Sequence, residues 1–188
     1  MKRFLRAFLT VDDAFNGIIH YNNWRRDYGV ADLKGDDPHI AEQIAKNKAR
    51  LLRPRDRKGR PIVHVQVKNH ITGEVELDHM TKFVVYMLEQ TANSIDETVI
   101  DNTCVVFDLK DFSMSNMDYQ VVKQLINLLN RYYPERLGVC IILNYPTIFS
   151  GCWAAIRPWL NEVTASKVQF VSDRKQLSQY LNPDVLKV

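Results

Sequence analysis

Two uninterrupted apolar runs, separated by a segment with helical periodicity, constrain this chain more than any other feature. The runs are Thr103–Leu109 and Val139–Leu143. Short β-branched runs without alternation are typical of strands covered on both faces, as in a parallel sheet. Between them, apolar residues recur at helical spacing over Asp118–Tyr133, and Pro134 ends that segment. Strand, helix and strand in this order predict a right-handed βαβ crossover, and therefore an α/β fold.

Two further strands and a hairpin extend this unit. Pro61–Lys68 alternates valine with polar residues, which predicts a half-exposed strand at or near the edge of the sheet. Lys167–Val171 supplies a fourth strand of a mostly parallel sheet. Leu51–Pro54 and the turn at 56–59 predict a hairpin into Pro61–Lys68. Helical patterns cover 14–24, His39–Asn47, His79–Ile95, Ile148–Leu160 and Asp173–Leu181.

Composition and length indicate a globular α/β protein in a reducing compartment. The chain has 188 residues, of which 46% are hydrophobic and 25% charged, and this is enough for a substantial core. Cys104, Cys140 and Cys152 lie in apolar segments and are predicted to be buried free thiols. No run reaches transmembrane length, and Arg6 interrupts the apolar N-terminus before a signal-peptide core can form. We expect a cytoplasmic protein with a helical N-terminal segment, 1–38, and an α/β domain, 39–188.

Signatures of catalysis are missing from the sequence. It contains no G-x-S-x-G elbow, no P-loop and no G-x-G-x-x-G after a strand. Ser150-Gly151-Cys152 lies inside a helical pattern, whereas a nucleophile elbow sits at a strand-to-helix turn. The five histidines lack the spacing of metal ligands. We therefore predict that the protein is not an enzyme and needs no metal or organic cofactor.

A basic stretch over residues 46–60 has three interpretations. It is opposed only by Asp56, while the net charge of the whole chain is only +3. The stretch can be a solvated hairpin rim, a contact patch for an anionic membrane, or a nucleic-acid surface. The last is disfavoured because no aromatic residues are interleaved for base stacking. The predicted membrane-contact residues are Arg53, Arg55, Arg57 and Lys58, within a set that also includes Lys46, Lys48, Arg50 and Arg60.

The segment from Tyr132 to Val171 resembles the CRAL-TRIO lipid-binding domain. The resemblance rests on Tyr132-Tyr133-Pro134-Glu135-Arg136-Leu137-Gly138, Asn144-x-Pro146 with Phe149 and Trp153, Arg157-Pro158-x-Leu160, and Thr164-x-x-Lys167-Val168. Upstream matches at Arg3–Ala7, Trp24–Arg26, Lys58–Pro61 and Phe107–Lys110 extend it over nearly the whole chain. The family includes phosphatidylinositol/phosphatidylcholine transfer proteins. Its members usually continue beyond both ends of this segment, so the resemblance implies truncation at both ends.

The resemblance implies an apolar lipid pocket closed by a movable gate helix at Ile148–Leu160. A well-packed core helix would give the same helical spacing of apolar residues. The two tryptophans are six positions apart, so one can face a cavity while the other faces solvent or a bilayer. We expect helices over one face of the sheet and the gate over the other. The predicted pocket-lining residues of the gate are Phe149, Trp153, Ile156, Trp159 and Leu160.

Glu135 and Lys167 are implied by the resemblance to hold an inositol phosphate headgroup, with Thr164 beside them. A lysine supplies a point charge for phosphate and a carboxylate accepts hydroxyl groups. Alternatively, Glu135 forms a structural ion pair with Arg136, and Lys167 is solvated. Thr103 is a candidate for a choline lipid, because one of two hydroxyls flanking Cys104 in that branch of the family is present.

Two departures from the family pattern leave the ligand open. Phe8 and Leu9 occupy positions where the phosphoinositide branch commonly has basic residues, and Val105 replaces the second hydroxyl beside Cys104. We predict a cytosolic domain that binds one phospholipid or other hydrophobic lipid and exchanges or presents it transiently at membranes. The alternatives are a regulatory or interaction module of a larger protein, with flanking domains or a protein partner, and a degenerate domain whose pocket is filled by its own side chains.

Overall fold

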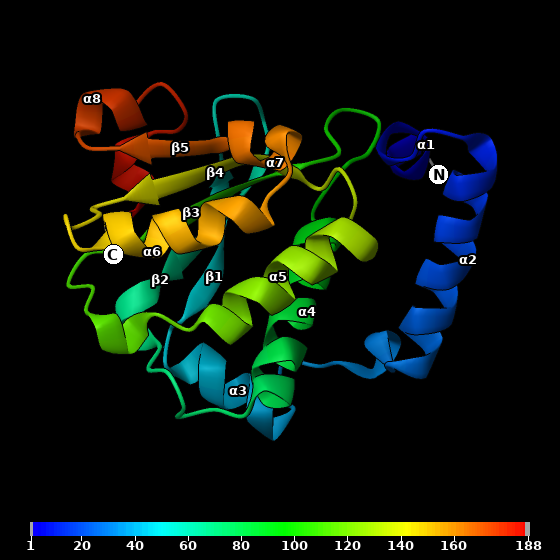
Figure 1. The fold of residues 1–188 in the computed structure, drawn as a ribbon, viewed down its shortest axis with the longest axis horizontal. Coiled ribbons are helices and arrows are strands. Elements are labelled where there is room, and N and C mark those ends of the chain that lie inside the picture. The colour runs from blue at the N-terminus through cyan, green and yellow to red at the C-terminus, as the bar shows by residue number, and fades with distance from the viewer. Residues whose placement is uncertain (1, 187–188) are drawn as a thin grey trace.

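A five-stranded sheet forms the centre of the computed structural model, which describes residues 2–186 (Figure 1). The strands follow one another in the order β1-β2-β3-β4-β5. The first pairs antiparallel with the second, and all other neighbours are parallel. The strands are β1 Ala49–Arg55, β2 Pro61–Gln66, β3 Thr103–Asp108, β4 Leu137–Leu143 and β5 Val168–Val171. The predicted βαβ crossover is therefore present as β3, α5 and β4.

The helices that connect the parallel strands lie on one face of the sheet. Because the strands are added in sequence order, right-handed crossovers place all of these helices on the same side, as Figure 1 shows for α4, α5 and α6. The helices are α1 Lys2–Ala7, α2 Val11–Asp27, α3 Pro38–Ala45, α4 Leu77–Asn93, α5 Tyr119–Arg131, α6 Phe149–Ile156, α7 Glu162–Ser166 and α8 Arg174–Leu177.

The predicted gate position on the sheet is wrong. Helix α6 packs on the same face as α4 and α5, through residues such as Ile142 and Phe149. The opposite face, which carries Val106 and Ile141, is covered by the C-terminal segment through Leu177 and Leu181. The prediction failed because it did not use strand order, which fixes the side of every crossover.

Strand β2 is more buried than its alternating sequence indicates. We predicted a half-exposed strand, but its first four residues are buried, and His64 is only 2% exposed. The reason is that both faces of β2 are covered: Ile62 packs in the core with Leu177 and Leu181, and Val63 faces the layer of helices. The polar side chain of His64 is accommodated by Arg50, whose Nη2 lies 3.4 Å from His64 Nδ1, and by Asp108 at 3.5 Å.

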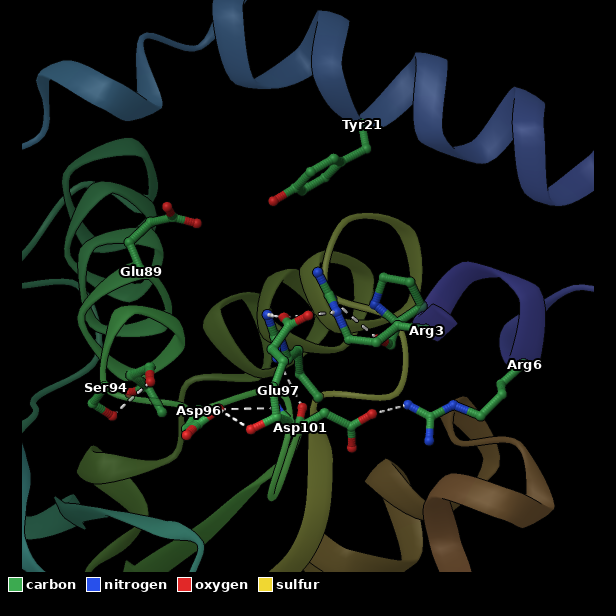
Figure 2. Close-up of polar contacts among 12 residues, drawn as sticks. Arg3, Arg6, Tyr21, Glu89, Ser94, Asp96, Glu97 and Asp101 are labelled. Atoms are coloured by element: carbon green, nitrogen blue, oxygen red, sulfur yellow. Dashed lines mark hydrogen bonds and ion pairs between the residues drawn. The ribbon is translucent and has the colours of Figure 1, made fainter. Parts of the chain in front are cut away.

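The N-terminal helices are fastened to the α/β part by aromatic and ionic contacts. Trp24 of α2 stacks on Tyr132 at the end of α5, with ring centroids 3.9 Å apart. Arg25 forms a bidentate pair with Glu89 of α4, at 2.7 and 2.8 Å, and Tyr133 donates to the same carboxylate at 2.6 Å. Figure 2 shows Tyr21 and Glu89 approaching one another from these two helices.

Helix α1 is tied to the loop between α4 and β3. Arg6 pairs with Asp101, and Arg3 lies 3.8 Å from Glu97 (Figure 2). Arg136 donates to the same Glu97 carboxylate at 2.5 Å. Two guanidinium groups therefore share one acidic partner. Burial, followed by the positive charge of Arg136, lowers the pKa of Arg3. These contacts hold the N-terminus beside the start of β4.

Candidate functional site: an apolar cavity under helix α6

An apolar cavity of about 280 Å³ lies between the sheet and the crossover helices. Its floor comes from β2, β3, β4 and β5, including Val105 and Ile142, and its walls come from α4 and α5, including Phe83 and Leu125. A concave, predominantly apolar site of this kind is typical of a binding site for a hydrophobic ligand. The open cavity argues against the degenerate-domain alternative, in which the chain's own side chains fill the pocket.

Helix α6 and the turn after it close one side of the cavity. Phe149, Trp153, Ile156 and Leu160 all line the cavity, as predicted for the gate. The α-helix ends at Ile156, and a 3₁₀ turn follows over Arg157–Trp159. Pro158 explains this ending, because its ring cannot continue the α-helical hydrogen-bond pattern.

The two tryptophans of this segment have different surroundings. Trp153 lines the cavity and meets Phe170 edge to face, with centroids 5.2 Å apart. Trp159 packs on α5, where its ring meets Tyr119 at 5.9 Å and Lys123 Nζ lies 4.6 Å from its centroid. Trp159 is not among the cavity-lining residues, and its half-buried ring fastens the end of the α6 segment to α5.

Exposed apolar side chains flank α6. Ile148 precedes the helix and is 54% exposed, and Val163 of α7 is 59% exposed. Tyr145 is also exposed, with its ring edge against Phe170. Apolar side chains that cost free energy in water are favourable at a bilayer interface, so the surface around both ends of α6 is suited to a membrane surface.

Glu135 and Lys167 meet at the amino edge of the sheet. Glu135 precedes β4 and Lys167 precedes β5, and Lys167 Nζ lies 3.4 Å from Glu135 Oε2. Both side chains remain partly accessible, at 33% and 22%. Arg136 instead pairs with Glu97, so the alternative pairing of Glu135 with Arg136 is wrong. The structure thus brings the two predicted headgroup residues together, and their role stays a prediction.

The two predicted threonines both line the cavity but differ in availability. The Thr103 hydroxyl is buried and donates to the Pro61 carbonyl at 2.9 Å, so its only proton is used within the protein. The Thr164 backbone N–H is capped by Asn161, and its partly buried side chain faces the cavity near Val168. Thr164 is therefore better placed than Thr103 to contact a ligand.

The predicted membrane-contact patch lies on the exposed β1–β2 hairpin. Arg53, Arg55, Arg57 and Lys58 are all exposed. Arg55 donates to the Ser94 carbonyl at 2.6 Å and Arg57 to the Ser178 carbonyl at 3.1 Å. The hairpin is therefore braced against the end of α4 and the C-terminal segment, while its charges stay accessible.

Other basic residues of the same stretch are internal. Arg60 is buried and pairs with Asp56 at 2.6 Å, which organises the hairpin turn. Lys48 is 1% exposed, and its ammonium lies 3.2 Å from His70 Nδ1. The prediction treated the stretch as one surface feature, because charge alone does not reveal which side of a strand a lysine occupies.

A polar group at the far end of the cavity escaped the sequence analysis. Lys48, His70, Asn116 and Asp118 all line that end. The residues come from three separate segments, because Asn116 and Asp118 share the loop before α5, so no local motif could have revealed the group. The available signal was weak: a lysine just before and a histidine just after the predicted hairpin, which meet at its open end.

Neither a metal centre nor a membrane span is found in the described part of the chain. Within residues 2–186, no three histidine, cysteine or acidic side chains are grouped so that they could hold a metal ion. No helix in the same range is long and apolar enough to cross a bilayer. All three cysteines are buried free thiols, as predicted.

Comparison with known proteins identifies the family. The CRAL/TRIO domain family matches residues 45–188. The chain therefore belongs to the CRAL/TRIO family, in which lipid binding and transfer, rather than catalysis, are the established activities. The crystal structure of Sfh5 superimposes with a TM-score of 0.78 over 92% of this chain and 65% of that one, at 22% identity, which supports the fold.

Two fungal proteins show similarity along almost the whole chain. The CRAL-TRIO domain-containing protein C3H8.02 of Schizosaccharomyces pombe is 35% identical over 98% of this chain and 43% of its own length. The phosphatidylinositol transfer protein CSR1 of Eremothecium gossypii is 31% identical over 96% of this chain and 44% of its own length. The chain thus spans less than half the length of these relatives.

Proposed function

We propose that this chain binds one phospholipid or other hydrophobic lipid in the cavity under α6 and exchanges it at membrane surfaces. The observation that carries the proposal is the apolar cavity of about 280 Å³, which α6 covers on one side. The family relationship supports it, since a similar chain is named a phosphatidylinositol transfer protein. No bond changes in this activity, because the lipid only partitions between bilayer and cavity.

The exchange step is proposed to take place at a membrane from the cytosolic side. Ile148, Tyr145 and Val163 present apolar groups beside α6, and the basic hairpin carries two exposed charges, Arg53 on β1 and Lys58 in the turn. Apolar insertion and attraction to anionic lipids act together in interfacial binding. When α6 moves into the membrane interface, its apolar face passes from the cavity to the lipid without being exposed to water. This lowers the free energy that opening requires.

The headgroup is proposed to contact Glu135, Lys167 and Thr164. The Lys167–Glu135 contact of 3.4 Å is long for a charge-assisted hydrogen bond, so both groups have capacity for a ligand between them. A phosphate would take the ammonium, and sugar hydroxyls would donate to the carboxylate. Each such bond contributes about 1.5–3 kcal/mol.

Mass spectrometry of lipid extracted from the purified chain tests this proposal. We expect one lipid per protein, and we expect phosphatidylinositol to be lost from both Glu135→Ala and Lys167→Ala. Lys175→Ala, an exposed charge on α8, is the matched control. A different lipid that persists in both variants would retain the cavity and refute the headgroup site. A wild-type chain that carries no lipid and moves none between vesicles would refute the function.

The interaction-module alternative is favoured by one observation. The chain covers 43% and 44% of two relatives, which leaves room in those proteins for other parts. A lipid would then act as a membrane address or a structural ligand, and exchange would be slow. Lipid extraction combined with a transfer assay separates the two functions, because a module retains its lipid without moving it.

A further inference from the structure

Lys48, His70 and Asp118 form a connected polar group at the carboxyl edge of the parallel strands. Lys48 precedes β1, and its carbonyl accepts the N–H of Gln66 at the end of β2. His70 follows β2, and Asp118 caps α5 after β3. In open α/β sheets, ligands bind outside the carboxyl ends of the strands. The predicted headgroup pair Glu135–Lys167 lies at the opposite, amino edge.

The hydrogen bonds of this group leave donors on Lys48. The Lys48 ammonium donates to His70 Nδ1 at 3.2 Å, and His70 Nε2 donates to Asp118 Oδ2 at 3.2 Å when the imidazole is neutral. The other Asp118 oxygen accepts the N–H groups of Gln120 and Val121. Asp118 and His70 are therefore satisfied, whereas an ammonium has three donors and Lys48 uses one of them in these contacts.

Lys48 is a buried cation without a carboxylate beside it. It is 1% exposed and lines the cavity. The nearby acidic residues Glu42 and Glu74 pair with Lys46 instead, at 2.9 and 3.7 Å. Within residues 2–186 no ion pair involves Lys48. Burial, followed by Lys46, lowers the pKa of Lys48 by more than the charges of Glu74, Glu42 and Asp118 raise it. An anion entering the cavity would remove this unfavourable state, since buried charges are ordinarily paired.

The cavity connects the two edges of the sheet. Thr103 and Val168 line it where β3 and β5 begin, and Gln66 lines it where β2 ends. A strand of six residues such as β3 spans about 20 Å at roughly 3.3 Å per residue. The apolar walls between the edges suit a hydrocarbon chain, and Lys48 suits an anionic group at the end of that chain.

We propose that Lys48, positioned by His70 and Asp118, binds the oxyanion of a single-chain amphiphile, a carboxylate or phosphate monoester, whose chain occupies the cavity under α6. Gln66 also lines this end of the cavity and adds an amide donor, whereas the Asn116 amide donates to the Lys68 and His70 carbonyls and helps to hold the His70 loop. This inference rests on the proposed lipid-binding function and names a class of ligand for it. The proposed binding site for the carboxylate or phosphate is at Lys48, separate from the predicted headgroup site at Glu135 and Lys167.

Calorimetric titration of the purified chain with oleate, oleoyl lysophosphatidate and oleyl alcohol tests the inference. We expect Lys48→Met to lower the affinity for one or both anionic ligands about tenfold to a hundredfold, which is the range of a charge-assisted hydrogen bond. The affinity for oleyl alcohol should not change. The acid that responds identifies the head as carboxylate or phosphate. His70→Gln should reduce the same preference, because it removes the group that orients the ammonium.

Lys46→Met is the matched control, since it removes a neighbouring charge that is paired outside the cavity. Methionine is apolar and similar in length to lysine, so the Lys48→Met variant should still fold, which circular dichroism verifies. Equal effects on acid and alcohol, or no effect on any ligand, would overturn the inference. A wild type that binds none of the three probes but moves phospholipid between vesicles would overturn the inference alone, whereas failure in both assays would overturn the function as well.

Discussion

Glu135 holds a backbone conformation that non-glycine residues rarely adopt. Its φ is 58°, in the left-handed region, at the turn that leads from α5 into β4. Such a conformation costs roughly 1–2 kcal/mol for a residue with a Cβ atom. A side chain that is kept at this cost in a turn opposite Lys167 is consistent with a role in ligand binding.

Replacement of Glu135 by glycine separates stability from binding. We expect Glu135→Gly to keep or raise the free energy of unfolding, by up to about 0.5 kcal/mol, because relief of the backbone conformation outweighs the added freedom of the unfolded chain. Phosphoinositide binding should fall, since the carboxylate is lost. Asn47→Gly, at φ 51°, is the control and should leave lipid binding unchanged. Urea denaturation and lipid titration measure both effects, and a large loss of stability would contradict this account.

Asp108 makes the protein sensitive to acid. Burial alone would raise the pKa of Asp108, but the contact with His64 and the hydrogen bond from Asn144 at 2.7 Å outweigh burial and lower the pKa to about 2. A carboxylate whose pKa is lowered by folding stabilises the protein above its unfolded pKa, and this contribution disappears as the pH falls through the folded pKa.

We therefore expect about 2 kcal/mol of stability from Asp108 ionisation at neutral pH, to be lost between about pH 4 and pH 2. Asp108→Asn should reduce the free energy of unfolding at pH 7 and flatten its dependence on pH in that acid range. Asp173→Asn, at the start of α8, changes a cap without this pair and serves for comparison. Chemical denaturation across pH measures the difference, and parallel profiles for wild type and Asp108→Asn would contradict it.

At the scale of elements, helix α6 is the segment on which exchange depends. Its inner face carries Cys152, which is 2% exposed and lies 3.8 Å from Met114 Sδ. Cys104 and Cys140 lie in the central strands instead, where burial raises the pKa of each thiol to about 12. Exposure of Cys152 therefore reports opening of α6, and exposure of Cys104 or Cys140 reports opening of the sheet.

Opening of α6 should expose Cys152 and leave the strand thiols protected. We expect anionic vesicles to accelerate labelling of Cys152 by a maleimide at least several-fold, with Cys104 and Cys140 unlabelled on the same timescale, because local opening costs less than unfolding. Mass spectrometry of peptides reads each thiol. Vesicles of neutral lipid provide the control, and equal labelling of all three cysteines would indicate global unfolding instead of gating.

The helices and strands were largely predictable from the sequence, whereas the face of the sheet on which each helix packs was not. The runs at Thr103–Leu109 and Val139–Leu143 became β3 and β4 because both faces of a parallel strand are buried. The face that α6 covers could not be read from residues, because it follows from strand order across the whole sheet. The packing of Trp159 on α5 was missed for a related reason: helical spacing gives its direction from α6 but not the position of α5.

The site was predictable where residues are close in sequence or follow a family pattern. Glu135 and Lys167 meet although 32 positions separate them, and a family resemblance proposed that pair. Lys48 and His70 were missed because their significance depends on burial at a cavity end. The sequence alone does not show whether a lysine in a basic stretch faces water or a cavity.

At the scale of the whole molecule, the exposed hairpin is expected to act as an electrostatic contact with membranes. Arg53→Gln with Lys58→Gln should weaken binding to vesicles containing phosphatidylserine by about 2 kcal/mol at low salt, at roughly 1 kcal/mol per basic residue. The difference should shrink as salt is raised. Lys110→Gln with Lys175→Gln removes the same charge from exposed positions elsewhere. Equal losses for both pairs in a sedimentation assay would mean that only net charge matters.

The central claim is that a lipid occupies the cavity under α6 and leaves it at membranes. Transfer of a fluorescent phospholipid between vesicles tests it most directly, with Val105→Phe to fill the cavity from β3 and Val163→Phe as a control on the exposed side of α7. The account predicts transfer by the wild type and by Val163→Phe, with transfer largely abolished in a folded Val105→Phe. Undiminished transfer by Val105→Phe, or none by the wild type, would contradict it.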